Sequence, residues 1–366
     1  MVNIAVLGYG TVGSGVVEVL RTNQESINKR AGQEINLKYV LDLRDFPGDP
    51  VEKVLVHDYD TILNDDDVKI VVEVMGGVNP AYQFVKNALL KGKSVCTSNK
   101  ELVAKHGAEL LEIAKANKIN FLFEASVGGG IPIIRPLNQS LTADEIVEIS
   151  GILNGTTNYI LTKMSKEGLP FDTVLKEAQE LGYAERNPEA DVEGYDACRK
   201  IAILSSLACG HQVDFEDIYT EGITKITDVD FKYASKLDVS IKLIGSSRKV
   251  VMFYGAGAGK LPTASAVVSD VVDAVKHMGT NIMTIWSTHK ADLVDIKNVV
   301  TRFFIRVKDD DDANVAAVKA AFNGEIVRAD GVTGEFGCVT APMTEKEYAD
   351  KAAGFDGIIS MIRYEG

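Results

Sequence analysis

The amino-terminal architecture follows from the stretch VLGYGTVGSGV, Val6–Val16, which joins an apolar strand to a helix. It places Gly8, Gly10 and Gly13 in the spacing GxGxxG. Such glycines permit a tight turn, let the backbone approach a pyrophosphate and allow close packing of the helix, whose N-terminus offers free N–H groups. Because a helix and a second strand follow the motif directly, it predicts a dinucleotide-binding unit.

Strands and helices alternate through the first part of the chain. The expected strands are residues 2–8, 35–43, 68–74, 93–98 and 119–125, and the expected helices are 11–21, 80–91 and 101–117. Short, nearly continuous apolar strands separated by helices indicate a parallel sheet covered on both faces, the doubly wound α/β class. We therefore expect a first domain over residues 1–135.

Composition narrows the class of protein. The chain has 366 residues, 46% hydrophobic and 25% charged, which is typical of a soluble globular protein with two or three domains. A net charge of -13 without any basic run argues against nucleic-acid binding. The sequence enters a strand without a charged leader, and no apolar stretch reaches the roughly 18 residues of a membrane span, so we expect no membrane contact and a cytoplasmic location.

Several site classes are excluded by spacing. The cysteines Cys96, Cys198, Cys209 and Cys338 show no CxxC pattern, and the five histidines show no HxxxH or HExxH pattern. Neither a zinc site nor a disulfide framework is therefore predicted. The glycine-rich stretch before residue 260 continues as GKL rather than GKS or GKT, which excludes a P-loop.

Ligands of open parallel sheets bind beyond the carboxyl ends of the strands. The loops expected there are residues 75–77, 98–100 and 126–132. Their small residues would admit a ligand close to the backbone, although Lys100 could equally be a surface lysine in the first turn of a helix. The candidates for cofactor contact in these loops are Met75, Gly76, Ser98 and Lys100.

The end of the second strand carries conflicting signals for the coenzyme. An acid such as Asp42 favours the ribose 2′-hydroxyl of NAD, whereas an arginine such as Arg44 can hold the 2′-phosphate of NADP. Asp42 lies 29 residues beyond Gly13, which exceeds the usual spacing of about 20. Both coenzymes stay open, and we favour NADP.

The remainder of the chain is expected to form two further domains, residues 136–297 and 298–366. The last of these reads strand, helix, strand, strand, helix, strand, the ferredoxin-like order. The acidic run Asp309 to Asp312 is expected to cap its first helix. Small domains of this kind are more often regulatory or oligomerising than catalytic.

One helical run, DACRKIAILSSLACG, places Asp196 and Lys200 four residues apart. The two lie about 40° apart on the helix, in the same stripe as the apolar Ile203 and Leu207. They could form an ordinary surface ion pair, which contributes a few tenths of a kcal/mol. They could instead project into a cleft, because two charges removed from water cost several kcal/mol unless they are paired and used.

Three stretches carry a resemblance to a known family. GILNGTTNYIL, EADVEGYDACRK and YGAGAGKLPTASAVVSD together resemble homoserine dehydrogenase, and the resemblance covers the chain from residue 1 to about 273. It implies a Rossmann domain, a catalytic and dimerisation domain, and reversible NAD(P)H-dependent interconversion of L-aspartate 4-semialdehyde and L-homoserine in threonine and methionine biosynthesis. It also implies a homodimer, or a homotetramer built from dimers.

The same resemblance assigns roles to residues. It implies that Lys200 donates the proton, that Asp196 is its partner, that Lys100 lies near cofactor and substrate, and that Glu185 holds the substrate, although Glu185 could be a solvated loop carboxylate. Further candidates are Tyr183 and Thr156 for the substrate, and Thr11, Val12, Gly182 and Gly259 for the cofactor. Glu124, Val127, Gly129 and Ile131 match positions that hold a sodium ion, mainly through backbone carbonyls.

The carboxyl-terminal segment resembles the amino-acid-sensing ACT domain, but it has DDDDAN where that family has a Pro-Gly turn. Feedback by threonine therefore stays open. Two rival functions are a semialdehyde dehydrogenase with Cys96 or Cys198 as nucleophile, and a nucleotide-binding regulatory protein without catalysis. Neither cysteine has an adjacent histidine to activate it.

Overall fold

A computed structural model describes residues 1–241 and 252–365 of the chain. Their contacts form two compact units, and each unit is assembled from separate segments of the sequence. The first unit contains Met1–Gly155, Tyr195–Ile218 and the described part of Ile244–Ala291. The second contains Thr156–Gly194 and the described parts of Tyr219–Leu243 and Asp292–Gly366.

The first unit is built on a six-stranded sheet in the order β3-β2-β1-β4-β5-β6. Every neighbouring pair in it is parallel, which confirms the doubly wound class. The order reverses between β1 and β4, and a ligand crevice is expected outside the carboxyl ends at such a switch point. The strands are β1 Val2–Leu7, β2 Ile35–Leu41, β3 Leu55–Val56, β4 Val68–Glu73, β5 Ser94–Thr97 and β6 Phe121–Leu122.

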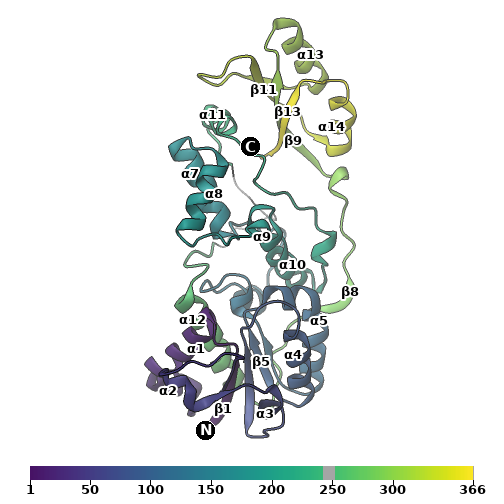
Figure 1. Cartoon of the computed structure of the whole chain (residues 1–366). Helices are drawn as coiled ribbons and strands as arrows, with labels where there is room; N and C mark the ends of the chain where they lie inside the picture. The colour runs from purple at the N-terminus through teal and green to yellow at the C-terminus, as the bar shows by residue number, and fades with distance from the viewer. Residues whose placement is uncertain (242–251, 366) are drawn as a thin grey trace. The chain divides into compact units, whose positions relative to one another are not determined.

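Helices cover both faces of this sheet, as Figure 1 shows. On one face lie α1 Thr11–Thr22, α2 Gln24–Ala31 and α12 Lys260–Lys276, and on the other lie α4 Ala81–Leu90 and α5 Lys100–Ala116. The three helices expected from the sequence are therefore present with nearly the expected bounds. The unit also contains η1 Pro50–Val54, α3 Tyr59–Leu63, η2 Glu124–Ser126, α6 Ile134–Gln139, α10 Tyr195–Cys209, β7 His211–Gln212, η3 Phe215–Asp217 and β8 Ser287–Lys290.

Helix α12 reaches the sheet from far along the sequence. Its Val267, Val271 and Val275 are buried in one apolar cluster with Val6 and Val72 of strands β1 and β4. The nucleotide-binding sheet is thus completed by a segment well beyond residue 135, which the sequence pattern did not predict.

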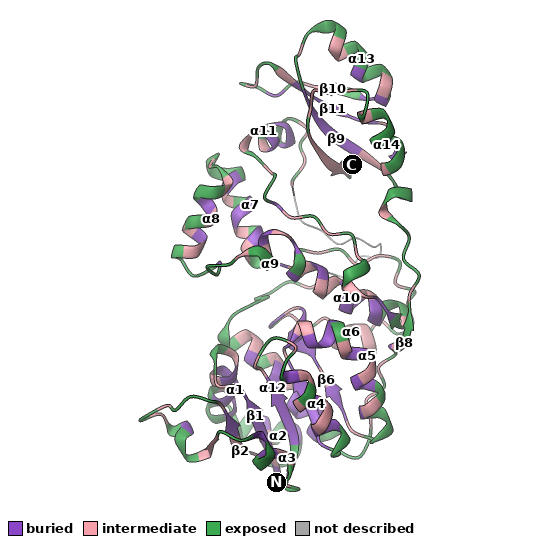
Figure 2. Ribbon diagram, turned by 45° about the vertical axis from the view of Figure 1, so that its right-hand side comes forward, coloured by how far each residue is buried: buried purple, intermediate pink, exposed green. Residues whose placement is uncertain are grey.

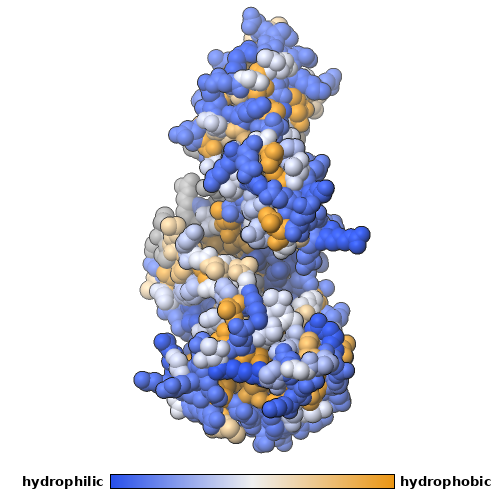
Figure 3. Space-filling view, turned by 60° about the vertical axis from the view of Figure 1, so that its left-hand side comes forward, coloured by the Kyte–Doolittle hydropathy of each residue, from blue (hydrophilic) through white to orange (hydrophobic). Residues whose placement is uncertain are grey.

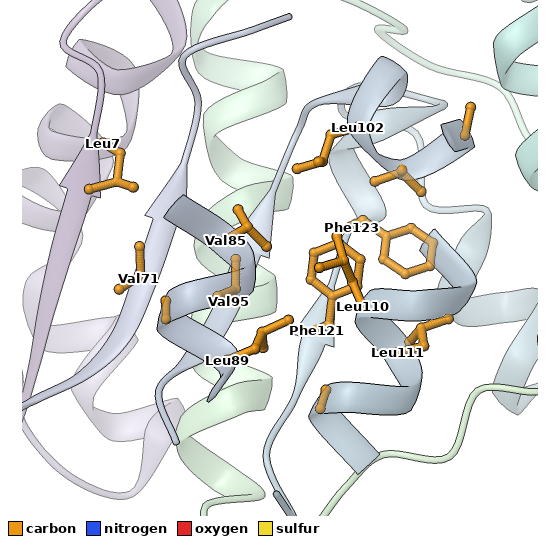
Figure 4. Close-up of a cluster of buried hydrophobic side chains, with 14 of the residues drawn as sticks. Leu7, Val71, Val85, Leu89, Val95, Leu102, Leu110, Leu111, Phe121 and Phe123 are labelled. Atoms are coloured by element: carbon orange, nitrogen blue, oxygen red, sulfur yellow. The ribbon is translucent and has the colours of Figure 1, made fainter. Parts of the chain in front are cut away.

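A second apolar cluster fills the opposite face of the sheet. Figure 4 shows strand residues such as Val71 and Val95 facing Leu89 of α4 and Leu102 and Leu110 of α5. The strands of this sheet are therefore mostly buried, as the purple strands in Figure 2 show. Burial on both faces is the physical reason for their almost continuous apolar sequence.

The second unit combines helices with an antiparallel sheet. Strand β9 pairs with β11, β12 and β13, and β10 pairs with β11. The expected order of strands and helices is observed, with the short β12 added. The elements are α7 Gly155–Glu167, α8 Phe171–Glu180, α9 Glu189–Val192, α11 Asp228–Lys236, η4 Ile296–Asn298, β9 Val300–Lys308, α13 Asp312–Phe322, β10 Glu325–Val327, β11 Glu335–Val339, β12 Met343–Thr344, α14 Glu345–Ala352 and β13 Ile358–Tyr364.

The acidic run caps α13 as expected. The carboxylate of Asp311 accepts hydrogen bonds from the amides of Ala313 and Asn314 at 3.1 and 3.0 Å. An acid at this end also interacts favourably with the positive end of the helix dipole. The sequence interpretation is confirmed at this position.

The surface is mainly polar. On the face drawn in Figure 3, hydrophilic residues cover most of the area. Within residues 1–241 and 252–365, no helix combines the length and the hydropathy needed to cross a bilayer.

Candidate active site

The glycine motif forms the turn from β1 into α1. A Cβ atom on Gly13 would lie 1.9 Å from the carbonyl oxygen of Gly8, so only glycine lets α1 pack this closely on the turn. The N-terminus of α1 has no side-chain cap, and a Cβ on Gly10 would meet nothing within 4 Å. Uncapped amides at Thr11 and Val12 beside open space suit the pyrophosphate of a dinucleotide.

Asp42 and Arg44 interact with each other beside this turn. The guanidinium of Arg44 donates to both carboxylate oxygens of Asp42, at 2.9 and 3.0 Å, and the amide of Tyr9 donates to the same carboxylate at 2.8 Å. These hydrogen bonds, led by the one from the Arg44 side chain, hold the pKa of Asp42 well below its usual range. The Arg44 side chain is 63% exposed, so it remains accessible to a ligand.

Asp196 is the centre of a buried charge cluster. Its Oδ1 lies 2.7 Å from Nζ of Lys100, and its Oδ2 lies 2.7 Å from Nζ of Lys200. Asp196 is only 4% exposed, and the Lys200 side chain 13%. The pair is therefore not a solvated surface pair, and Lys100, which follows β5, joins it from a different element.

The cluster has further partners. The side-chain amide of Asn154 donates to Oδ2 of Asp196 at 3.0 Å, and Lys200 Nζ donates to the carbonyl of Leu153 at 2.7 Å. Burial alone would raise the pKa of Asp196, but the ammonium groups of Lys200 and Lys100 lower it to about 2. One carboxylate thus faces two cations, so the cluster carries a net positive charge.

Two ion pairs join helices α5 and α10, and each helix supplies the cation of one pair and the carboxylate of the other. Besides Lys100 and Asp196, Glu101 of α5 lies 3.0 Å from Arg199 of α10. The first turn of α5 is capped by Asn99, whose Oδ1 accepts the Leu102 amide at 3.1 Å. The second ion pair and the cap of α5 therefore help to hold Lys100 beside Asp196.

Sequence analysis missed a buried polar group at the carboxyl ends of β4 and β5. Glu73, Thr97 and Asn99 are all buried there and hydrogen-bond to one another. The available signal was a glutamate at the end of an apolar strand, in VVEV. The apolar pattern around it predicts a strand and gives no sign that its carboxylate is buried among donors.

The carboxylate of Glu124 is hydrogen-bonded by backbone amides of its own chain segment. It accepts the amides of Ile133, Ile134 and Arg135 at 2.6, 2.9 and 2.7 Å, at the start of α6. Val127, Gly129 and Ile131 lie in the loop between η2 and α6. Over the described residues, no three His, Cys, Asp or Glu side chains gather as a metal site. A cation in this loop would therefore be held mainly by backbone carbonyl oxygens, a donor set that suits a hard ion.

The loop that carries Gly129 also contacts the glycine-rich loop before α12. The Gly130 amide donates to the carbonyl of Ala256 at 3.1 Å. Gly259 follows and is the residue before α12. The structure thus brings Gly129 and Gly259 into adjacent loops within the first unit.

The other predicted substrate residues belong to the second unit. Thr156 Oγ1 donates to the carbonyl of Tyr183 at 2.7 Å, which ties the start of α7 to the loop after α8. Gly182, with a φ of +75°, begins this loop, and Tyr183 and Glu185 are exposed on it. The structure therefore groups Thr156, Tyr183, Gly182 and Glu185 around one loop.

The two cysteines considered as nucleophiles, Cys96 and Cys198, are both buried. Cys96 is fully buried in β5, and burial raises the pKa of its thiol well above the ordinary value. Cys198 is also buried, and its thiol donates to the carbonyl of Phe215 at 3.3 Å. A reactive thiolate needs exposure and a lowered pKa, so this geometry gives no support to cysteine catalysis.

Comparison with known proteins gives a consistent result. Residues 8–124 match the family model of the homoserine dehydrogenase NAD-binding domain, and residues 132–251 match that of homoserine dehydrogenase. The homoserine dehydrogenase of Bacillus subtilis (strain 168) is 41% identical over 76% of this chain and 73% of its own. That of Neisseria gonorrhoeae is 35% identical over 100% of this chain and 98% of its own.

Solved structures agree. The crystal structure of a homoserine dehydrogenase from Thiobacillus denitrificans matches with a TM-score of 0.88 and 34% identity over 100% of this chain and 98% of its own. A hyperthermophilic archaeal homoserine dehydrogenase mutant in complex with NADPH matches with a TM-score of 0.61 and 28% identity, over 75% of this chain and 97% of its own. The charge cluster around Asp196 and the glycine turn thus lie in a protein that belongs, by sequence and by fold, to the homoserine dehydrogenase family of NAD(P)-dependent oxidoreductases.

Proposed function

We propose that this protein reversibly reduces L-aspartate 4-semialdehyde to L-homoserine with Lys200 as the proton donor. The cluster that the buried Asp196 forms with the largely buried Lys200 and the partly exposed Lys100 carries this proposal. Hydride transfer to an aldehyde builds negative charge on the carbonyl oxygen, which needs a proton donor and electrostatic stabilisation. An ammonium group provides both.

The geometry supports distinct roles for the three residues. An ammonium has three N–H donors, and Lys200 directs two of them to Asp196 and to the Leu153 carbonyl. The third is available to the substrate oxygen. Asp196 fixes the orientation of Lys200, and Lys100 adds a second positive charge that favours the developing alkoxide.

Substrate and coenzyme contacts follow the same proposal. Glu185 pairs with the α-ammonium of the substrate, with Tyr183 and Thr156 beside it. The coenzyme, when bound, supplies or accepts the hydride. NADP is favoured because the accessible Arg44 guanidinium can hold a 2′-phosphate. The coenzyme contacts are Gly8, Gly10, Thr11, Val12, Gly13, Arg44, Met75, Gly76, Ser98, Lys100, Gly182 and Gly259.

Further features belong to the same proposal. A sodium ion is held by Glu124, Val127, Gly129 and Ile131, mainly through backbone carbonyls. The protein is a cytoplasmic homodimer, with dimers able to pair into tetramers. Residues 1–135 bind the coenzyme, residues 136–297 serve catalysis and dimerisation, and residues 298–366 form an ACT-like domain.

One assay tests the reaction, the coenzyme and the feedback together. Oxidation of L-homoserine is followed through the absorbance of the reduced coenzyme, with NAD or NADP, with and without sodium, and with and without threonine. We expect turnover with homoserine and a higher kcat/KM with NADP. Absence of turnover with both coenzymes would refute the proposed reaction.

A further inference from the structure

Glu73 is a buried carboxylate that the proposed chemistry does not use. It is the last residue of β4, is 0% exposed, and pairs in register with Thr97, the last residue of β5. Its side chain therefore lies at the carboxyl edge of the sheet, between the loop that follows β4 and the turn that leads into α5.

All the partners of this carboxylate donate hydrogen bonds. The hydroxyl of Thr97 donates at 2.6 Å, the amide of Met75 at 2.8 Å and the side-chain amide of Asn99 at 3.5 Å. Thr97 Oγ1 in turn accepts a hydrogen bond from the backbone amide of Asn99 at 2.9 Å. The hydroxyl proton of Thr97 therefore points at Glu73. Burial raises the pKa of Glu73 above its ordinary value, and these hydrogen bonds offset that rise only in part. A set of donors without an acceptor is the set that an ionised carboxylate needs.

Asn99 connects this carboxylate to both loops. Its side-chain amide donates to the carbonyl of Gly77 at 2.6 Å, and its Oδ1 caps α5 at the Leu102 amide. The next residue, Lys100, begins α5 and pairs with Asp196. Hydrogen bonds therefore connect Glu73, through Thr97, to Asn99, the residue that precedes Lys100.

We propose that Glu73 is a positioning residue, whose carboxylate clamps the loop of residues 74–77 against the turn of residues 97–100. In this way it fixes Lys100 relative to Asp196 and holds the backbone of the loop that contains Met75 and Gly76 in one position beside the coenzyme site. The inference rests on the proposed function, in which Lys100 and these loops serve substrate and coenzyme.

Two variants test the clamp. Glu73→Gln keeps the size of the side chain but presents an amide donor to partners that are themselves donors. Thr97→Val keeps the shape of Thr97 but removes the hydroxyl that donates to Glu73. A displacement of about 1 Å at a reacting group can lower turnover by about 10²-fold. We expect kcat to fall by about that factor in Glu73→Gln and by about 10-fold in Thr97→Val.

The matched control is Glu109→Gln. Glu109 lies on α5 and accepts a hydroxyl, that of Tyr82, at 2.9 Å, together with Lys86 at 2.7 Å, but it has no contact with the clamp residues. The Glu109→Gln variant tests whether the loss of any hydrogen-bonded carboxylate at α5 lowers kcat as Glu73→Gln does. We expect its kcat and its coenzyme affinity to stay near those of the wild type.

The measurements are kcat and KM for homoserine, the Kd for NADPH by fluorescence titration, and the unfolding temperature, with assays run well below unfolding. A clamp predicts a lower kcat together with a raised Kd for NADPH in both clamp variants. If both variants unfold at a lower temperature but keep wild-type kcat and Kd, Glu73 has only a structural role and the inference is overturned. If the wild type does not oxidise homoserine, the proposed function fails, and the NADPH titrations still decide whether Glu73 holds the coenzyme loop.

Discussion

Asp196 neutralises half of the charge that it gathers. With one carboxylate and two ammonium groups, the cluster keeps a positive charge in a place where Lys200 has little access to water. Buried cations are costly unless they are paired, so removing the carboxylate would also displace both amines. The arrangement is therefore suited to hold a proton donor in one orientation toward a developing negative charge.

Lys200→Ala removes the proposed proton donor. We expect kcat to fall by roughly 10²- to 10⁴-fold, the usual contribution of general acid catalysis, while the Kd for NADPH changes little. Steady-state kinetics and coenzyme titration measure both effects. The unfolding temperature should fall, because the buried Asp196 carboxylate loses one of its two cations. Lys105→Ala, an exposed position on α5, is the control. Near-normal turnover in Lys200→Ala would remove the assignment.

Asp196 also gives stability a defined pH dependence. Its pKa is lowered from 3.8 to about 2 in the folded protein, so the stabilisation is complete above about pH 4 and is lost as the pH falls through about 2. The shift corresponds to roughly 2 kcal/mol. We expect the difference in free energy of unfolding between the wild type and Asp196→Asn to shrink by about this amount on acidification. Denaturant titrations at several pH values measure it, and a constant difference would contradict the assigned pairing.

Arg44 and Asp42 should control the choice of coenzyme. Arg44→Ser removes the only charge that we assign to the 2′-phosphate, so kcat/KM with NADP should fall by about 10- to 10²-fold while kcat/KM with NAD stays nearly constant. Asp42→Asn releases the guanidinium from its ion pair and should shift preference further toward NADP. Equal losses with both coenzymes in Arg44→Ser would count against a phosphate contact.

The elements themselves were largely predictable, whereas their pairing was not. Helix α1 and strand β1 follow from apolar periodicity and from the glycine motif, both of which are local signals. The approach of α5 to α10, which joins Lys100 to Asp196, depends on tertiary packing between distant segments. The i,i+4 spacing therefore predicted Lys200 as the partner of Asp196, but it could not place Lys100 there.

The start of α6 shows the same limit. Glu124 accepts three backbone amides that a chain reversal brings to it, and no sequence spacing records that reversal. Glu124→Gln leaves at least one of these amides without an acceptor, so we expect a loss of about 1–3 kcal/mol in the free energy of unfolding. Denaturant unfolding with and without sodium measures this loss. A sodium-dependent increase in stability that disappears in the variant would also support the proposed cation site, whereas unchanged stability would contradict the capping role.

The two units alternate along the chain, and each contains several separate segments. Domains defined as consecutive residue ranges therefore cannot describe them fully. Helix α12 completes the face of the nucleotide-binding sheet, although more than half of the chain separates it from β1. Periodicity predicts that α12 is a helix with an apolar side, but it carries no information about which sheet receives that side. Tertiary packing decides which sheet α12 covers. The domain organisation proposed from the sequence must therefore allow the chain to return to the first unit at α12.

Residues 298–366 also depend on an element from outside their own range, because their sheet shares an apolar cluster with α11. Tyr233 of α11 is buried with Phe304 and Val339, and the guanidinium of Arg306 lies 3.0 Å from Asp230 of α11 and 2.8 Å from Glu335. Residues 298–366 are therefore bound to an earlier helix by both apolar and ionic contacts. An autonomous domain would not need this support.

Arg306→Met tests that dependence. The change leaves Asp230 and Glu335 without their buried cation, which typically costs about 3–5 kcal/mol, so we expect a large loss in the free energy of unfolding. Arg328→Met, at an arginine of the same segment that is 52% exposed and paired with Asp310, should cost no more than about 1 kcal/mol. Chemical denaturation followed by circular dichroism compares the two variants. Equal, small effects would mean that the buried ion pair does not hold α11 to the sheet, and residues 298–366 would then be better described as a domain that is stable on its own.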